Sequence, residues 1–302
     1  MPPPATAQPK SPERAVGVIH YLSLLSFGDN LISLSLLAKV RARRDVAILG
    51  TGLTKQIAAF VPELDLPIAI VGDSVPSFYD LRKRGIGAAV RDALAVRRSI
   101  VRLTARGDGL ILEKDGWRGR LLTRSAGRRS WAPVRRRNVY EDRRDVLALV
   151  LGEEISLEPV ARPRRAPTSV TINPASRMRD KAIAPRVLAS IVAYLRRREV
   201  AVRLIDPEKE HGALRSEVSS YHTGTTLEEA VALVDASDLY MGADSLLVHF
   251  AYHRRTPVIV LYNETNLYFA PPGVEESNSF IDFVARRSES DLWARLDQLL
   301  SP

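Results

Sequence analysis

The sequence predicts an α/β protein with two doubly wound, Rossmann-like domains facing each other across a cleft. Short apolar stretches alternate with amphipathic helical stretches in both halves of the chain, which is the pattern of a parallel sheet covered by helices. Residues 159–168 carry prolines and arginines with little periodicity, as is typical of a linker. We therefore expect a disordered tail over residues 1–14, a first domain over residues 15–158 and a second domain over residues 169–302.

The first half begins with a run of apolar and β-branched residues that predicts strand one, and the alternation then continues. Strands are expected at residues 15–22, 45–49, 66–71 and 99–103. Helices are expected at residues 31–43, 53–60, 77–84 and 142–151. A hairpin pairing residues 109–113 with residues 118–122 is expected before an irregular basic segment, residues 125–137.

The second half repeats the alternation. Strands are expected at residues 169–172, 200–205, 239–241 and 258–262. Helices are expected at residues 185–198, 227–235 and 292–300. Thr225 or Thr226 should cap the second of these helices, because acidic residues fill its first turn.

The composition is that of a soluble globular protein, with 45% hydrophobic and 26% charged residues. No apolar run is long enough to predict a membrane span. The absence of cysteine excludes disulfides, thiolate metal sites and a cysteine nucleophile. The net charge of +9 falls entirely within residues 1–160. This asymmetry indicates either an anionic partner for the first half or simply solvated, arginine-rich faces.

Several common site motifs are missing from the chain. It has no dinucleotide-binding glycine fingerprint, no P-loop and no serine-hydrolase elbow. The five histidines lack the spacing of a zinc site, so no metal is expected. No nucleic-acid-binding signature accompanies the basic segments, so no nucleic-acid partner is expected.

Two polar junctions remain as candidate sites. Asp244 and Ser245 precede a predicted helix at N-cap positions, where free N–H groups suit a phosphate, and His249 lies about one turn further on. Gly28 and Asp29 follow strand one, which places a carboxylate at the edge where ligands bind in open α/β sheets. The alternative for both junctions is an ordinary capped helix, with an ordinary histidine in the second.

Three segments, in this order along the chain, resemble motifs of one family. Residues 27–30 resemble a Gly-Asp loop, and residues 173–177 with Lys181 resemble a donor-phosphate loop. Residues 243–249, followed by the apolar run and turn of residues 257–265, resemble the segment that closes the donor site. Together they resemble glycosyltransferase family 9, the bacterial heptosyltransferases, which have the GT-B fold. The chain departs from the family pattern at Leu246, Asn263 and Glu264, where the family has glycine or proline.

The resemblance implies a metal-independent, inverting glycosyltransferase that moves a sugar, with heptose as the first candidate, from a nucleotide-sugar to an acceptor glycan such as lipopolysaccharide core. Asp29 would be the base that takes the proton of the acceptor hydroxyl. The donor diphosphate would be bound by side chains of both later segments: Ser176, Arg177, Lys181, Asp244, Ser245 and His249. No cofactor is implied, and ADP-heptose is the first candidate for the donor.

The basic first domain would bind the acceptor, an anionic glycan or glycolipid. Its candidate contacts are arginines, which can pair with carboxylates or phosphates: Arg128, Arg129, Arg135, Arg136 and Arg137. With Trp131, this segment could also lie on anionic lipid, which implies a cytoplasmic protein with peripheral contact to the inner membrane. Two alternatives stay open: a non-transferase nucleotide-sugar enzyme such as an epimerase or hydrolase, and a catalytically degenerate nucleotide-sugar-binding protein.

Overall fold

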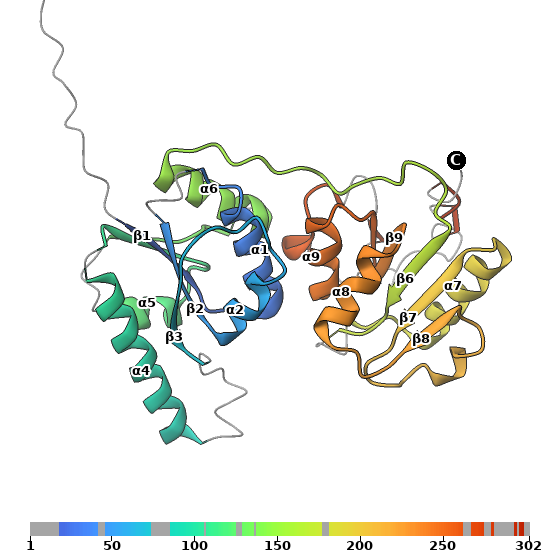
Figure 1. Cartoon of the computed structure of the whole chain (residues 1–302), viewed down its shortest axis with the longest axis horizontal. Coiled ribbons are helices and arrows are strands. Elements are labelled where there is room, and N and C mark those ends of the chain that lie inside the picture. Colours follow the sequence, from blue (N-terminus) through green and yellow to red (C-terminus); the bar gives the residue numbers. More distant parts are fainter. Residues whose placement is uncertain are drawn as a thin grey trace, which may run out of the picture.

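The first half forms a five-stranded sheet in which all neighbouring strands are parallel, in the order β3-β2-β1-β4-β5 (Figure 1). The computed structural model describes residues 18–41, 46–73, 85–105, 107–124, 129–135, 137–176, 181–261, 267–274, 279–280, 293–294 and 296–298. The strands are β1 (Ile19–Ser23), β2 (Val46–Thr51), β3 (Ile68–Gly72), β4 (Gly109–Leu112) and β5 (Arg129–Trp131).

Helices cover both faces of this sheet because its strands are apolar on both sides. Tyr21 and Ile111 join the core beneath three helices: α1 (Phe27–Leu37), α2 (Gly52–Ala58) and α6 (Val139–Leu151). Leu22 and Leu112 point the other way, into the core beneath two helices: α4 (Ile86–Thr104) and α5 (Trp117–Thr123). Successive residues of a strand point to opposite faces, which explains the split.

The second half forms a six-stranded sheet, also parallel throughout, in the order β11-β10-β9-β6-β7-β8. The strands are β6 (Ser169–Asn173), β7 (Ala201–Ile205), β8 (Ser220–His222), β9 (Leu239–Ala243), β10 (Val258–Leu261) and β11 (Ser279–Phe280). The helix α7 (Pro185–Arg197) packs on one face, and α8 (Leu227–Asp235) and α9 (Leu246–His253) pack on the other. Two 3-10 turns complete the elements: η3 (Gly212–Leu214) and η4 (Leu267–Phe269).

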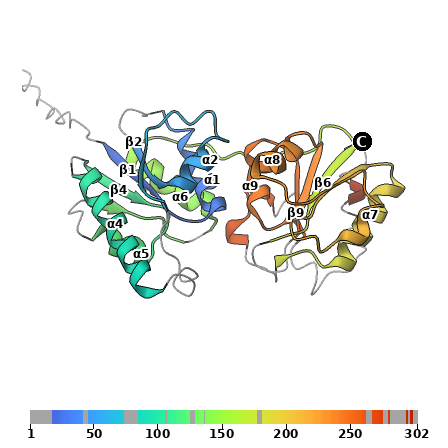
Figure 2. The same ribbon diagram turned by 60° about the horizontal axis from the view of Figure 1, so that its bottom comes forward.

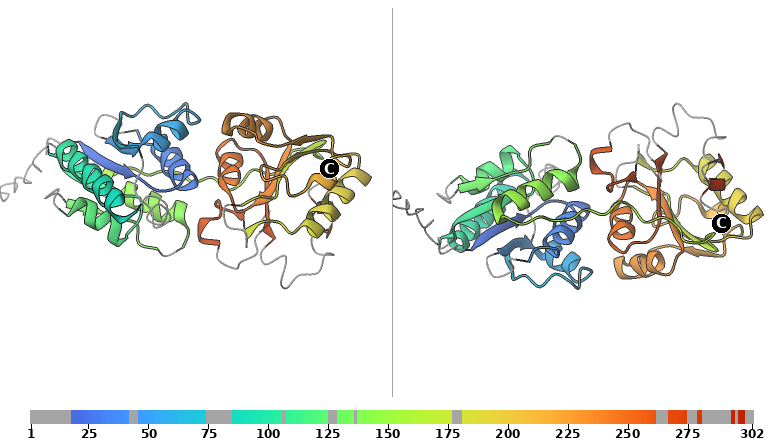
Figure 3. Two further views of the ribbon diagram at one scale, coloured as in Figure 1. Left: turned by 90° about the horizontal axis from the view of Figure 1, so that it is seen from below. Right: turned by 90° about the horizontal axis from the view of Figure 1, so that it is seen from above.

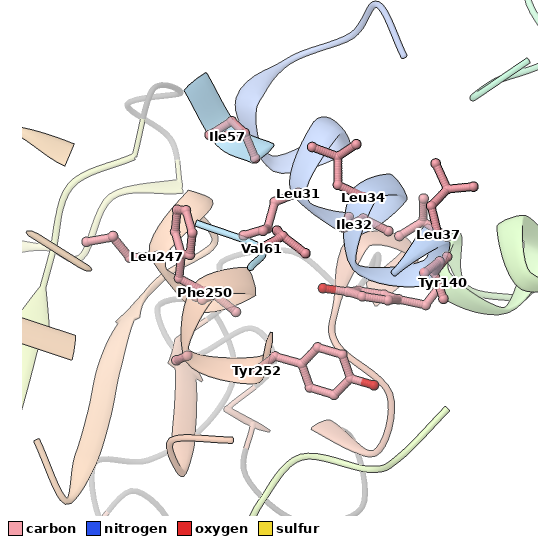
Figure 4. Close-up of a cluster of buried hydrophobic side chains, with 14 of the residues drawn as sticks. Leu31, Ile32, Leu34, Leu37, Ile57, Val61, Tyr140, Leu247, Phe250 and Tyr252 are labelled. Carbon is pink, nitrogen blue, oxygen red and sulfur yellow. The ribbon is translucent and has the colours of Figure 1, made fainter. Parts of the chain in front are cut away.

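One buried apolar cluster continues from the first half into the second, through helices α1 and α9. Leu31 from α1 and Phe250 from α9 are both fully buried within it (Figure 4). Phe60 meets Phe250 edge to face at 5.3 Å, and Tyr140 of α6 meets Tyr252 of α9 at 5.0 Å. The views from above and below show the two halves side by side, joined across these helices (Figure 3).

The chain passes from the first sheet to the second without regular structure between Gly152 and Thr168. Val160 in this stretch is held by its N–H, which donates to the carbonyl of Pro272. The predicted linker falls inside this stretch, although the domain boundaries themselves stay a prediction. Among the described residues, no helix combines the length and the apolar character needed to cross a membrane.

Most expected elements form within a few residues of their predicted limits, and two expectations are wrong. Residues 99–103 are the last turns of α4 and not a strand, because Val96, Ile100 and Thr104 recur on one buried helical face. The predicted hairpin is also wrong: residues 109–112 are the parallel strand β4, and residues 118–122 lie within α5. The expected helix over residues 77–84 lies outside the described residues.

Candidate functional site

Asp29 lies in the first turn of α1, directly after the carboxyl end of β1. The N-cap of this helix is Ser26, so the alternative that Asp29 is a plain N-cap is wrong. The Ser26 hydroxyl donates to Oδ2 of Asp29 at 2.8 Å, while Oδ1 accepts from Nη2 of Arg143 at 2.6 Å. A carboxylate in the first helical turn also suits the helix dipole. The Asp29 side chain is held firmly, yet 19% of it remains exposed.

Arg143 of α6 holds Asp29 from beneath, and only 2% of its side chain is exposed. Its guanidinium also donates to the carbonyl of Asp29 at 2.7 Å, to Ser33 Oγ at 3.0 Å and to the carbonyl of Glu113 at 3.2 Å. Burial alone would lower the pKa of Arg143, but the charges of Tyr21, Asp29 and Glu113 raise it above its ordinary value. The guanidinium therefore stays charged beneath the site.

Glu113, the residue after β4, is the second buried carboxylate of this network. It accepts from the backbone N–H groups of Leu24 and Leu25 at 2.7 and 2.9 Å, and from the hydroxyls of Ser23 and Ser33 at 2.8 and 3.0 Å. Burial raises the pKa of Glu113, and the charge of Arg143 opposes that rise. Glu113 thus fixes the loop that leads from β1 to Asp29.

The second domain brings three predicted donor-binding residues together where β6 and β9 end. Lys181 Nζ lies 2.7 Å from Oδ2 of Asp244. The Ser176 hydroxyl donates to the carbonyl of Asp244 at 3.0 Å. Ser245 is the N-cap residue of α9, as predicted, but its side chain makes no capping hydrogen bond. The predicted Arg177 lies outside the described residues.

His249 of α9 joins the two sides of the site. Its Nδ1 lies 2.8 Å from the Tyr140 hydroxyl. Its ring lies against Gly28, where an added Cβ would come within 3.2 Å of Cδ2. Burial lowers the pKa of His249, while the charges of Asp244 and Asp29 oppose that fall.

Among the predicted acceptor arginines that the structure describes, Arg129 lies away from Asp29. Arg129 begins β5, at the amino end of the sheet and therefore at the edge opposite Asp29, and its guanidinium stacks over Trp131 at 5.0 Å. Trp131 is half-buried against the core, which argues against its lying on lipid. Arg135 stacks over Tyr268 of η4 at 4.4 Å.

Arg137 approaches the site's helix through its backbone, since its N–H lies 3.5 Å from Oδ1 of Asp142 in α6. Arg128 and Arg136 lie outside the described residues, as do Asn263 and Glu264. Among the residues that the structure describes, no three His, Asp or Glu side chains gather where they could hold a metal ion.

The motifs did not reveal Arg143, Glu113 or Tyr140. The one available signal was the position of Glu113 after an apolar run, because polar residues at the carboxyl ends of parallel strands often belong to sites. Because residues 109–113 were predicted as part of a hairpin, Glu113 was not recognised as the residue that follows a parallel strand. Arg143 stands in a run of charged residues, 141–145, that resembles an ordinary solvated helix face.

Comparison with known proteins gives one family match. Residues 160–287 match the model of glycosyltransferase family 9 (heptosyltransferase). No curated protein matches the chain in a sequence search.

Three solved structures share the architecture at low identity. E. coli heptosyltransferase WaaC with ADP is 13% identical, with a TM-score of 0.68 over 93% of this chain and 99% of that one. E. coli ADP-heptose lps heptosyltransferase II is 16% identical, with a TM-score of 0.63 over 93% and 99%. A glycosyl transferase family 9 protein from Veillonella parvula DSM 2008 is 13% identical, with a TM-score of 0.65 over 95% and 90%. The predicted GT-B fold is confirmed.

Proposed function

Because residues 160–287 match the model of glycosyltransferase family 9, we propose that the chain transfers a heptose from a nucleotide-sugar to an acceptor glycan such as lipopolysaccharide core. The proposal includes a metal-independent, inverting mechanism. One observation supports it: the His249 ring of α9 lies against Gly28, the neighbour of Asp29, while the same helix begins just after Asp244, which pairs with Lys181. The proposed base and the proposed phosphate-binding pair are thus linked through α9.

Asp29 is the proposed base. An inverting transfer needs a group that takes the proton of the acceptor hydroxyl while its oxygen attacks the anomeric carbon. Both Asp29 oxygens already accept one hydrogen bond each, and a carboxylate oxygen has room for a second. The fixed position and the 19% exposure of the side chain support this role.

The leaving nucleoside diphosphate would be stabilised by Lys181, Ser176, Ser245 and the first turn of α9. Negative charge develops on that group as the glycosidic bond breaks, and an ammonium, hydroxyls and free helical N–H groups can meet it. Asp244 pairs with Lys181. A donor diphosphate would compete with Asp244 for this ammonium.

The donor proposal is ADP-heptose, because the E. coli relatives were solved with ADP or are described by ADP-heptose. The proposed acceptor is anionic and binds the basic first domain. Its candidate contacts include Arg137, whose N–H faces Asp142 in the first turn of α6, and Arg135, which stacks over Tyr268. Action on a lipid-anchored acceptor implies a cytoplasmic enzyme at the inner membrane.

The first test is a thermal-shift screen with ADP-, UDP-, GDP- and dTDP-sugars, in which ADP-heptose should give the largest shift. Asp29→Asn should keep this shift but lower the transfer rate by about 10²- to 10⁴-fold, since the isosteric amide cannot take a proton. Asp145→Asn, on an exposed carboxylate of α6, is the matched control and should leave the rate unchanged. A near-normal rate in Asp29→Asn would reject the base.

A companion pair of variants tests the donor side. Lys181→Met should weaken ADP-heptose binding, and Lys55→Met, an exposed lysine of α2, should not. Equal donor affinity in both variants would remove Lys181 from the site. If none of the four donors shifts the melting temperature, the nucleotide-sugar proposal fails as a whole.

A further inference from the structure

Helices α4 and α5 expose five large apolar side chains on the first domain, which we call the α4–α5 face. Between 43% and 73% of each is exposed: Ile86, Val90, Leu94, Trp117 and Leu121. The two helices pack against each other (Figure 2). These five are half of the large apolar side chains exposed among the described residues. Single exposed apolar residues are ordinary, but a concentration of them marks an interaction surface.

The arrangement along α4 is that of a helix lying in an interface. Ile86, Val90 and Leu94 are spaced four residues apart and therefore form one stripe. With about 100° of rotation per residue, the buried residues of α4 fall on one side of the stripe. A row of exposed arginines falls on its other side: Arg91, Arg98 and Arg102.

The face lies at the same end of the domain as the site. Helices that connect parallel strands run back against them, so α4 and α5 begin at the edge of the sheet where the strands end. Trp117, the first residue of α5, follows the buried Glu113 by four residues. Ile86 is the first residue of α4. The exposed apolar residues therefore lie toward the edge that carries Asp29.

The charge around the face selects its partner. Residues 85–124 contain nine Lys or Arg against four Asp or Glu. Of these, Asp115 is already paired with Arg120, and Glu113 is buried. A second copy docked on the same face would bring two arginine rows together, since symmetric interfaces use the same patch on both subunits. An anionic lipid surface can take up the apolar stripe between its headgroups and can attract the arginines to its phosphates.

We propose that the α4–α5 face binds an anionic membrane surface, with its apolar side chains entering the headgroup layer and its arginines pairing with lipid phosphates. Such docking would hold the edge that carries Asp29 next to the bilayer. This inference rests on the proposed function, which places the enzyme at the inner membrane, and it assigns the surface that makes the contact.

The test is co-sedimentation of the full chain with vesicles, without any sugar substrate. Binding to phosphatidylglycerol/phosphatidylcholine vesicles should exceed binding to phosphatidylcholine alone, and it should weaken as salt rises. Ile86→Glu and Leu121→Glu should each weaken binding about tenfold or more, since each replaces an inserted apolar group with a charge that anionic lipid repels. Leu149→Glu on α6, an equally apolar position that is 76% exposed, should bind like wild type.

Two further measurements make the outcome decisive. Tryptophan emission should shift to the blue on anionic vesicles, and Trp117→Phe should lose most of the shift. Equal binding to neutral vesicles, or unchanged binding in the two face variants, would overturn the proposal. A concentration-dependent dimer that Ile86→Glu abolishes would assign the face to a second copy instead. If ADP-heptose fails to bind while vesicle binding holds, only the proposed reaction fails.

Discussion

Removing the guanidinium beneath Asp29 is the most direct test of how the site is built. Arg143→Met keeps the length and apolar stem of the side chain but deletes four hydrogen bonds, to Asp29, Ser33 and Glu113. Breaking one partner of a buried ion pair typically costs about 3–5 kcal/mol, because the remaining charge is left without compensation. With only 2% of Arg143 exposed, water cannot replace these bonds without opening the core. We expect a loss of about 3–5 kcal/mol in the free energy of unfolding.

Denaturant unfolding followed by circular dichroism measures this loss, and the neighbouring residue supplies the control. Arg144 pairs with Asp145 at the surface, where such pairs contribute about 0–1 kcal/mol, so Arg144→Met should have little effect. Adding Asp29→Asn to Arg143→Met should recover part of the loss, because it removes the carboxylate that the first change leaves without its ion-pair partner. If Arg143→Met and Arg144→Met differ by less than about 1 kcal/mol, the buried network does not hold the site.

Two further predictions concern the contact between the domains. Burial lowers the pKa of His249, so its contribution to stability is present above the ordinary histidine pKa of about 6.5 and is lost as the pH falls below it. His249→Gln should therefore flatten part of the acid-side slope of stability against pH in a series of unfolding curves, and an unchanged slope would contradict this role. Alanine at Gly28 would come within 3.2 Å of His249, whereas nothing lies within 4 Å of the corresponding position at Gly87, the second residue of α4. Gly87→Ala should therefore raise the melting temperature, in line with a gain of about 0.5–1 kcal/mol, and an equal gain in Gly28→Ala would show that the histidine contact is unimportant.

Local signals predicted the fold where periodicity and caps agreed. The helix α8 has its predicted limits, because Thr226 and Glu229 form the expected capping box before an apolar run. The end of α4 was mistaken for a strand because Ile100 and Val101 are β-branched neighbours. Their helical register becomes visible only together with Ala89 and Val96 upstream. The three-residue strand β5 is too short to leave a pattern, and it forms because β4 offers it a free edge.

Candidate site residues could be predicted where they stand together in one short motif. They were missed where they come together only through folding. The loops carrying Asp29, Lys181 and Asp244 resemble segments of family 9, and residues 160–287, which include Lys181 and Asp244, match the model of that family. The roles of these residues stay predictions. Arg143 contacts Asp29 across 114 residues of sequence. No local pattern encodes such a partner, because its identity depends on how α6 packs against α1.

Helix α9 links the chemistry of the site to the packing between the domains. His249, which meets Gly28, is followed at once by Phe250, which is fully buried in the shared core, and Tyr252 of the same helix packs edge to face on Tyr140. Burying a side chain of this size contributes about 1.5–3 kcal/mol, so the position of α9 is set by core packing and not by loops. Asp29 is placed in the same way, through α1 and its ion pair with α6. The proposed base and the proposed phosphate site are therefore coupled through one continuous core, and a cavity made at Phe250 should disturb transfer although this side chain touches neither substrate.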